Sequence, residues 1–270
     1  MSRTEARNPK TTNFSKESTI DMLKIINEEN MNSVKAVEDA LGDVAKAVDA
    51  VTAAFLQGGR LIYVGAGTSG RIAVMDASEC PPTFGVDYNT VITVMAGGKD
   101  AMFRAAEGVE DSADAGREDL LERIPTERDV VMGISASGNA EYVASALRTA
   151  KELGCVTISL SSNEKCKIGS IADIAIFVNT GAEVISGSTR MKAGNSQKFV
   201  LNMITTCAMA KTGKVYENLM INLRPTNIKL KGRMIGIVAD ICEVSEEEAL
   251  RLLEKNDFSI RKVFQQFGMV

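Results

Sequence analysis

Hydrophobic residues in the middle of the chain form short runs separated by longer amphipathic stretches. The runs are rich in β-branched residues without strict alternation, which is typical of strands buried on both faces; they span 61–64, 91–95, 129–134, 156–160 and 174–178. Helical periodicity marks 71–77, 101–110, 140–153 and 191–211. This alternation predicts an α/β fold with a five-stranded parallel sheet sandwiched by helices. Ligands of such sheets bind beyond the carboxyl ends of the strands.

The flanking segments have other patterns. Residues 1–17 are polar and predict a flexible arm, or one that orders on a partner. Residues 18–57 predict two helices, broken near 27–32, that pack on a sheet domain spanning 58–224. Residues 225–270 predict a small helical domain, in which Ser245 and Glu248 have the spacing of a capping box.

Composition narrows the possible chemistry. The chain has no His, which excludes histidine triads and histidine metal sites and leaves acid/base work to Glu, Asp, Lys, Tyr or Cys. A net charge of -4 without a dense basic block predicts no nucleic-acid partner. The 5 cysteines form no Cys-x-x-Cys pair, which argues against a disulfide framework or a metal site. Without a signal-peptide core or a run of about 18 apolar residues, the pattern predicts a cytoplasmic protein with no membrane contact.

Two hydroxyl-rich loops directly follow predicted strands. The first, 65–71, matches the Gly-x-Gly-x-x-Gly dinucleotide pattern, but no acidic residue ends the next strand, so by itself it supports a structural turn and a phosphate cradle equally. The second loop, 135–139, makes a phosphorylated ligand the favoured interpretation, because two such loops can grip one phosphate. The candidate binding residues are Gly67, Thr68, Ser69, Ser135, Ser137 and Gly138.

Candidate carboxylates lie after the first and second predicted strands. Glu79 precedes Pro81 and Pro82, which are expected to stop its helix. Glu107 and Glu110 are three residues apart, on one face of a predicted helix. Two carboxylates could divide the acid and base roles, one of them held protonated by burial. Spacing alone favours solvated surface residues for each of them.

The segment 183–194 combines small residues, hydroxyls, one acid and two cations before a predicted helix. Cations and helix N-terminal amides in one place suit an anionic substrate. The alternative is a capped helix start with exposed basic side chains. We favour substrate binding, with Glu183, Ser188 and Lys192 as candidates.

At these residues the chain resembles the N-acetylmuramic acid 6-phosphate etherase family, which carries a sugar isomerase (SIS) domain. The matching runs are 61–71, 76–85, 107–111, 133–138 and 183–194. The resemblance extends from about residue 18 to residue 227 and implies an SIS fold. The chain departs from the family pattern after Cys242, where its helical tail is shorter than the resemblance implies.

The resemblance also implies an activity. It is hydrolytic cleavage of the D-lactyl ether of N-acetylmuramic acid 6-phosphate to N-acetylglucosamine 6-phosphate and D-lactate, by elimination then hydration, in cell-wall amino sugar recycling. By this resemblance Glu79 is the proton donor and Glu110 the second acid/base, with no metal or other cofactor. It further implies a homodimer with sites near the subunit interface, where 183–192 or the N-terminal helices serve the neighbouring subunit. A phosphosugar-sensing regulatory protein, which would not need the two glutamates, and a sugar-phosphate isomerase are the alternatives.

Overall fold

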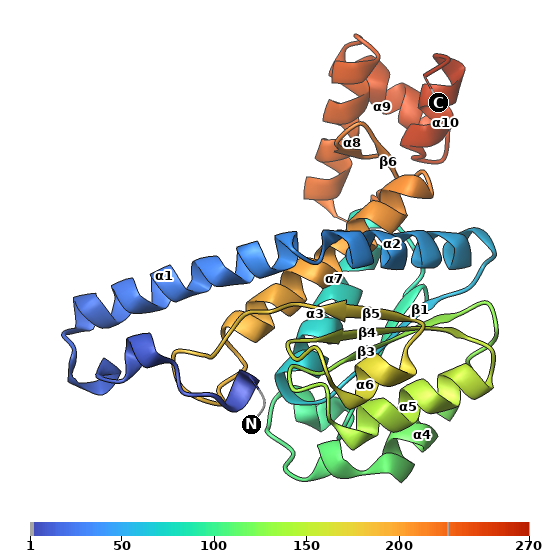
Figure 1. Ribbon diagram of the computed structural model, residues 1–270. Helices are drawn as coiled ribbons and strands as arrows, with labels where there is room; N and C mark the ends of the chain where they lie inside the picture. Colours follow the sequence, from blue (N-terminus) through green and yellow to red (C-terminus); the bar gives the residue numbers. More distant parts are fainter. Residues whose placement is uncertain (1–2, 226, 270) are drawn as a thin grey trace. The chain divides into compact units, whose positions relative to one another are not determined.

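A central sheet of five parallel strands organises the first part of the fold (Figure 1). The computed structural model describes residues 3–225 and 227–269. The strands are β1 (Leu61–Gly65), β2 (Val91–Met95), β3 (Val130–Ile134), β4 (Val156–Ser161) and β5 (Ile174–Phe177), in the order β2-β1-β3-β4-β5. In this register Gly65 lies level with Met95 and Ile134, so the carboxyl ends meet at one edge. The predicted α/β fold is confirmed.

Helices cover both faces of the sheet. The helices of this part are α1 (Thr19–Glu38), α2 (Leu41–Leu56), α3 (Gly67–Phe84), α4 (Ala113–Leu121), α5 (Glu141–Glu152), α6 (Lys167–Ile171) and α7 (Lys192–Lys211). Figure 1 shows α5 on one face and α2 on the other. Every residue of β1 and β3 is buried, which explains why their sequences do not alternate.

A buried carboxylate joins β1, α3 and α7. Asp76 accepts hydrogen bonds from the hydroxyl of Tyr63 (2.8 Å), the amide of Asn202 (2.6 Å) and the hydroxyl of Thr205 (3.2 Å). Burial raises the pKa of Asp76, and the three hydrogen bonds oppose that shift. This network fixes the helix that carries the first hydroxyl-rich loop.

The predicted break within the N-terminal helices is wrong. α1 continues through 27–32, and the break lies at 39–40. Glu29 and Ser33 are buried on one side of α1, and the Ser33 hydroxyl donates to the carbonyl oxygen of Lys192 at 3.2 Å. These tertiary contacts outweigh the low helix propensity of the asparagines in this stretch.

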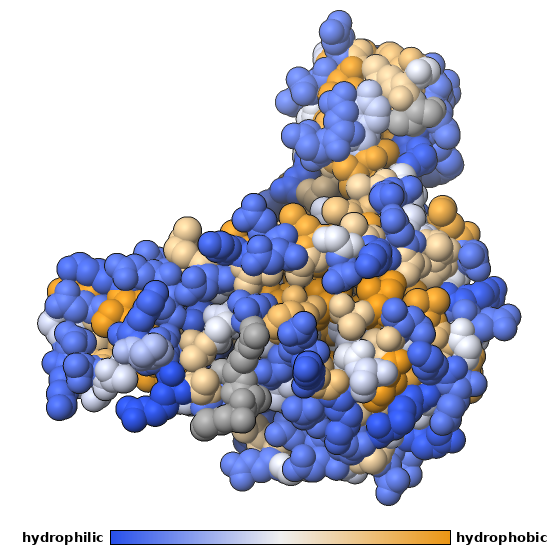
Figure 2. All heavy atoms as spheres, in the orientation of Figure 1, coloured by the Kyte–Doolittle hydropathy of each residue, from blue (hydrophilic) through white to orange (hydrophobic). Residues whose placement is uncertain are grey.

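The opposite side of α1 carries exposed apolar residues at helical spacing. Orange spheres lie among the blue ones over this helix in Figure 2. The exposed fractions are 58% for Ile20, 57% for Leu23, 65% for Met31 and 54% for Val34. Within the described part of the chain, this stripe is left open to solvent.

Two further expectations about helices are wrong. Pro81 and Pro82 do not stop α3, which continues to Phe84; each proline removes only one backbone donor, and the helix ends soon afterwards. The region 101–110 is not a helix but contains the 3-10 turns Lys99–Met102 and Val109–Asp111. Gly108 has a φ of 76°, a left-handed conformation that a helix cannot continue through.

The chain divides into two compact units. The first comprises Met1–Ala77 and Asn89–Ala208, and the second comprises Ser78–Tyr88 and Met209–Val270. The second unit contains β6 (Val215–Tyr216), β7 (Leu219–Met220), α8 (Ile228–Ile241), α9 (Glu246–Lys255) and α10 (Ile260–Gln266). Ser245 caps α9 by accepting from the Glu248 amide at 3.2 Å, which confirms the predicted cap. The domain limits at 17, 57 and 224 stay predictions.

Candidate functional site

The loop after β1 is shaped by glycines that a side chain could not replace. A Cβ placed on Gly65 would lie 2.8 Å from the amide nitrogen of Gly70, so the start of α3 approaches the end of β1 closely. Gly67 begins α3 with a φ of 53°. Thr68 is half-buried and Ser69 is 7% exposed. Backbone amides of the first helical turn and two hydroxyls thus gather at the carboxyl end of β1, where an anion is favoured.

The loop after β3 holds its hydroxyls by internal hydrogen bonds. The Gly138 amide donates to Ser135 Oγ at 3.1 Å, and the Asn139 amide donates to Ser137 Oγ at 3.2 Å. Gly138 has a φ of 72°, and a Cβ there would lie 2.4 Å from the sulfur of Cys166. A serine hydroxyl that accepts one hydrogen bond still has its own proton to donate. The two hydroxyl oxygens lie 3.4 Å apart, so one serine donates to the other. Both serines can donate to a phosphate oxygen and keep the amide bonds once this mutual bond is exchanged for the phosphate.

Arg71 positions the segment that leads to Glu110. Its guanidinium donates to three carbonyl oxygens, those of Ala101 (2.7 Å), Met102 (3.1 Å) and Arg104 (3.3 Å). Arg71 is the last residue of the hydroxyl-rich loop 65–71, and its donors hold the chain after β2. Glu110 follows in the turn Val109–Asp111 and is exposed.

Glu79 lies on α3 and is also exposed. It belongs to the second compact unit, whereas Glu110 belongs to the first. The described chain by itself does not enclose either carboxylate. The expected division into one protonated and one ionised glutamate stays a prediction.

Glu183 and Lys192 are both buried within the protein, each 1% exposed. Glu183 caps α7, because its carboxylate accepts from the amides of Lys192 (3.1 Å) and Ala193 (3.0 Å). Burial raises the pKa of Glu183, and these amides and the Lys192 charge oppose the shift. Lys192 Nζ donates to the Glu29 carboxylate and to the Ala182 carbonyl oxygen. The alternative of exposed basic side chains is therefore wrong for Lys192, and substrate binding by Glu183, Ser188 and Lys192 stays a prediction.

Several curated proteins similar to this chain are named N-acetylmuramic acid 6-phosphate etherase. An N-acetylmuramic acid 6-phosphate etherase from Clostridium beijerinckii is 48% identical over 96% of this chain and 85% of its own length. One from Caldanaerobacter subterraneus is 50% identical over 96% of this chain and 84% of its own. The chain belongs to the N-acetylmuramic acid 6-phosphate etherase family. The resemblance noted from the sequence motifs is thus confirmed.

Other comparisons place this etherase-family chain in the SIS fold. The model of the glucokinase regulatory protein N-terminal SIS domain matches residues 43–151. A phosphoheptose isomerase from Francisella tularensis has a TM-score of 0.57 at 16% identity, covering 72% of this chain and 100% of its own. A phosphoheptose isomerase from Neisseria gonorrhoeae has a TM-score of 0.53 at 17% identity, covering 70% of this chain and 99% of its own. At these identities the two structures establish the shared fold.

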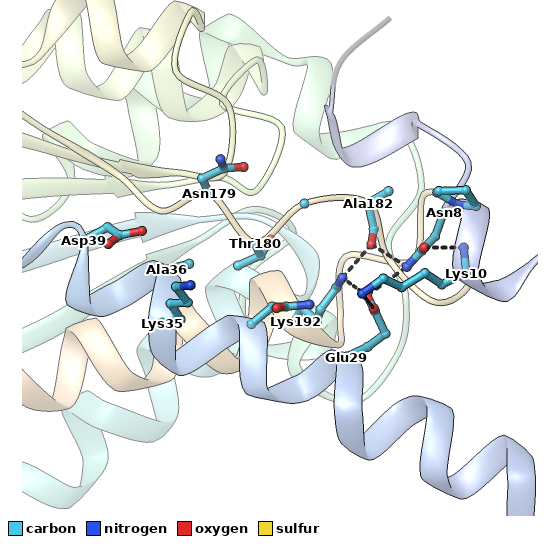
Figure 3. A pocket seen from close by; sticks show the side chains of 13 residues that line it. Asn8, Lys10, Glu29, Lys35, Ala36, Asp39, Asn179, Thr180, Ala182 and Lys192 are labelled. Carbon is cyan, nitrogen blue, oxygen red and sulfur yellow. Dashed lines mark hydrogen bonds and ion pairs between the residues drawn. The ribbon is translucent and has the colours of Figure 1, made fainter.

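The etherase-family chain also contains a polar cavity of about 440 Å³ that the sequence did not indicate (Figure 3). Its wall is formed by residues 8–10, by α1, by 179–182 and by Lys192. These segments are far apart in the sequence, so only folding brings them together. Among the residues that the structure describes, no cluster of Cys, Asp and Glu is arranged to hold a metal ion, and no helix is long and apolar enough to cross a membrane.

Proposed function

We propose that this protein cleaves the D-lactyl ether of N-acetylmuramic acid 6-phosphate, yielding N-acetylglucosamine 6-phosphate and D-lactate. The observation that carries the proposal is the identity of 48 to 50% with etherases over 96% of the chain. The reaction belongs to cell-wall amino sugar recycling. We assign it to the cytoplasm, because all five cysteines are free thiols.

The phosphate would be anchored by neutral donors at the carboxyl edge of the sheet. Thr68, Ser69 and the amides at the start of α3 would approach it from one loop, and Ser135 and Ser137 from the other. Gly67 and Gly138 let the backbone come close. Neutral donors and a helix N-terminus suit a dianion, because they stabilise its charge without a competing counter-charge.

The chemistry is an elimination followed by a hydration. Opening of the sugar ring exposes an aldehyde that acidifies the proton on carbon 2. Ionised Glu110 removes that proton, the bond from carbon 3 to the lactyl oxygen breaks, and protonated Glu79 donates its proton to the departing lactate. Glu79, now ionised, takes a proton from water as the hydroxyl adds to carbon 3, and Glu110 returns its proton to carbon 2. The two glutamates end in their starting states.

The mechanism requires that Glu79 be shielded from bulk water, and we propose that a second copy of the chain and the bound substrate provide the shielding. A homodimer is supported by the open apolar stripe on α1, where Ile20, Leu23 and Met31 are each more than half exposed. Burial of such residues in an interface stabilises it by about 25 cal/mol per Å² of apolar surface.

Measurement of D-lactate from N-acetylmuramic acid 6-phosphate tests the proposal directly. We expect Glu79→Gln to abolish release and Glu110→Gln to lower kcat by about a hundredfold or more, because each substitution removes a proton carrier without changing side-chain volume. Glu107→Gln is the matched control, since Glu107 is exposed and lies three residues before Glu110. Turnover that survives both substitutions would remove the proposed acid/base pair.

A phosphosugar-sensing regulatory role is the second candidate. The match of residues 43–151 to the glucokinase regulatory protein SIS domain favours it. Such a protein would bind sugar phosphates without releasing lactate, so the same assay combined with calorimetric binding separates the two functions.

A further inference from the structure

The N-terminal segment 3–11 is held against its own chain by buried polar groups. It contains the 3-10 turns Arg3–Glu5 and Pro9–Thr11. Thr4 is 1% exposed, and Asn8 and Thr11 are each 8% exposed. Buried polar groups must find hydrogen-bond partners or cost stability. We call residues 3–11 the arm segment.

The first anchor of the arm segment is the stretch 182–188 of the same chain, which contains the candidate binding residues Glu183 and Ser188. Side chains and backbone of both segments are joined directly, so that neither can move far alone. Two bonds come from side chains of the arm segment: the side-chain amide of Asn8 donates to the Ala182 carbonyl oxygen (3.3 Å), and the Thr11 hydroxyl donates to the Val184 carbonyl oxygen (2.8 Å). A third joins the two backbones, from the Gly187 N–H to the Thr4 carbonyl oxygen (3.1 Å).

The second anchor is a buried ion pair, drawn in Figure 3. The Asn8 amide donates to Glu29 Oε2 at 2.8 Å, and the same carboxylate pairs with Lys192. Glu29 lies on α1 and Lys192 is the first residue of α7. Because the pair is shielded from water, its hydrogen bonds are stronger than surface ones. Asn8 therefore fixes the arm segment to two helices of the first unit.

The third anchor reaches the phosphate loop itself. Asn163, which is 6% exposed, follows β4 at the carboxyl edge of the sheet. Its amide nitrogen donates to the carbonyl oxygen of Ser137 at 3.1 Å and to the Thr4 hydroxyl at 3.4 Å. One amide group thus joins the arm segment to the loop after β3.

We propose that the arm segment is a built part of the phosphosugar site, with Thr4 and Asn163 as positioning residues for the loop that contains Ser135 and Ser137. The proposal deepens the proposed function and rests on it for the identity of the sugar. Positioned donors bind the phosphate equally in the ground state and the transition state. Loosening them should therefore raise KM and leave kcat unchanged.

Four variants separate positioning from general stability. Asn163→Asp keeps the shape but replaces the donor by an acceptor that faces the Ser137 carbonyl, and we expect KM to rise about tenfold. Thr4→Val removes the hydroxyl and should raise KM about threefold, and Thr4→Ser, which retains a hydroxyl, should restore most of that loss. Thr12→Val makes the same change at an exposed threonine just beyond the arm segment, and we expect wild-type KM. The KM values are compared at a temperature at which thermal unfolding curves show the wild type and all four variants to be folded.

Binding of N-acetylglucosamine 6-phosphate by calorimetry distinguishes failure of this proposal from failure of the proposed function. Suppose that the wild type binds this sugar phosphate but releases no D-lactate, so that the etherase proposal fails. The arm proposal then still stands if Thr4→Val weakens the binding and Thr4→Ser does not. If the wild type releases D-lactate and folded Thr4→Val and Asn163→Asp keep its KM within twofold, the arm segment does not position the site. A fall in kcat at constant KM would also overturn the proposal.

Discussion

Replacement of Lys192 by methionine tests whether this lysine is a structural residue or a substrate ligand. Its ammonium lies 2.6 Å from the Ala182 carbonyl oxygen and pairs with Glu29, and their side chains are 2% and 7% exposed. Lys192→Met would leave the Glu29 carboxylate buried with two remaining partners. These are the side-chain amide of Asn8 and the ammonium of Lys10, whose Nζ is 3.8 Å from Glu29 Oε1 and whose side chain is 77% exposed. Removal of one partner of a buried pair costs about 3–5 kcal/mol, and the exposed Lys10 recovers at most about 1 kcal/mol.

The partner substitutions turn this estimate into a coupling energy. Glu29→Gln combined with Lys192→Met leaves two neutral side chains, so we expect the double variant to be more stable than Lys192→Met alone. The expected coupling energy between the two positions is about 2 kcal/mol or more. Urea unfolding of the wild type, both single variants and the double variant, at one fixed protein concentration, gives the four free energies of unfolding.

The pH dependence provides an independent check. Burial opposes ionisation of Glu29, but the Lys192 and Asn8 donors hold its pKa below the ordinary value. A lowered pKa contributes stability that is present above the unfolded-state pKa and is lost as pH falls through the folded-state value. The stability difference between the wild type and Lys192→Met should therefore shrink on acidification. An unchanged urea midpoint for Lys192→Met, together with a raised KM, would show that Lys192 binds substrate instead.

Two further predictions concern packing at the two ends of β3. Asp129→Asn should lower the free energy of unfolding by about 2 kcal/mol, because the buried Asp129 carboxylate accepts a 2.7 Å bond from Arg60. Burial opposes ionisation of Asp129, but Arg60 and two backbone amides hold its pKa below the ordinary value. Equal urea midpoints for the wild type and this variant would contradict the prediction. Gly138→Ala should lower Tm and raise KM, because Gly138 has a φ of 72° and an added Cβ would meet Cys166; unchanged values of both in differential scanning calorimetry and the lactate assay would contradict it.

Strands were easier to predict than loops. The runs at β1 and β3 are buried on both faces, so their apolar composition alone identifies them. The helix predicted for 101–110 is wrong for two reasons. Gly108 adopts a left-handed conformation that interrupts the helical spacing, and the carbonyl oxygens of this stretch bond to Arg71, which is distant in the sequence. The buried donors of Asp76 were equally invisible, since Asn202 and Thr205 are distant in the sequence.

The sequence by itself determined the class of fold, the hydroxyl-rich loops and the family, because these depend on residue types at short and fixed spacings. Tertiary structure alone decided which polar residues face one another. The local pattern around Glu183 and Lys192 does not reveal that Glu183 caps α7 or that Lys192 pairs with Glu29 on a distant helix, and substrate binding by either residue stays a prediction. The energy of a charged side chain depends on its burial and its partners, and both are fixed only when distant segments meet.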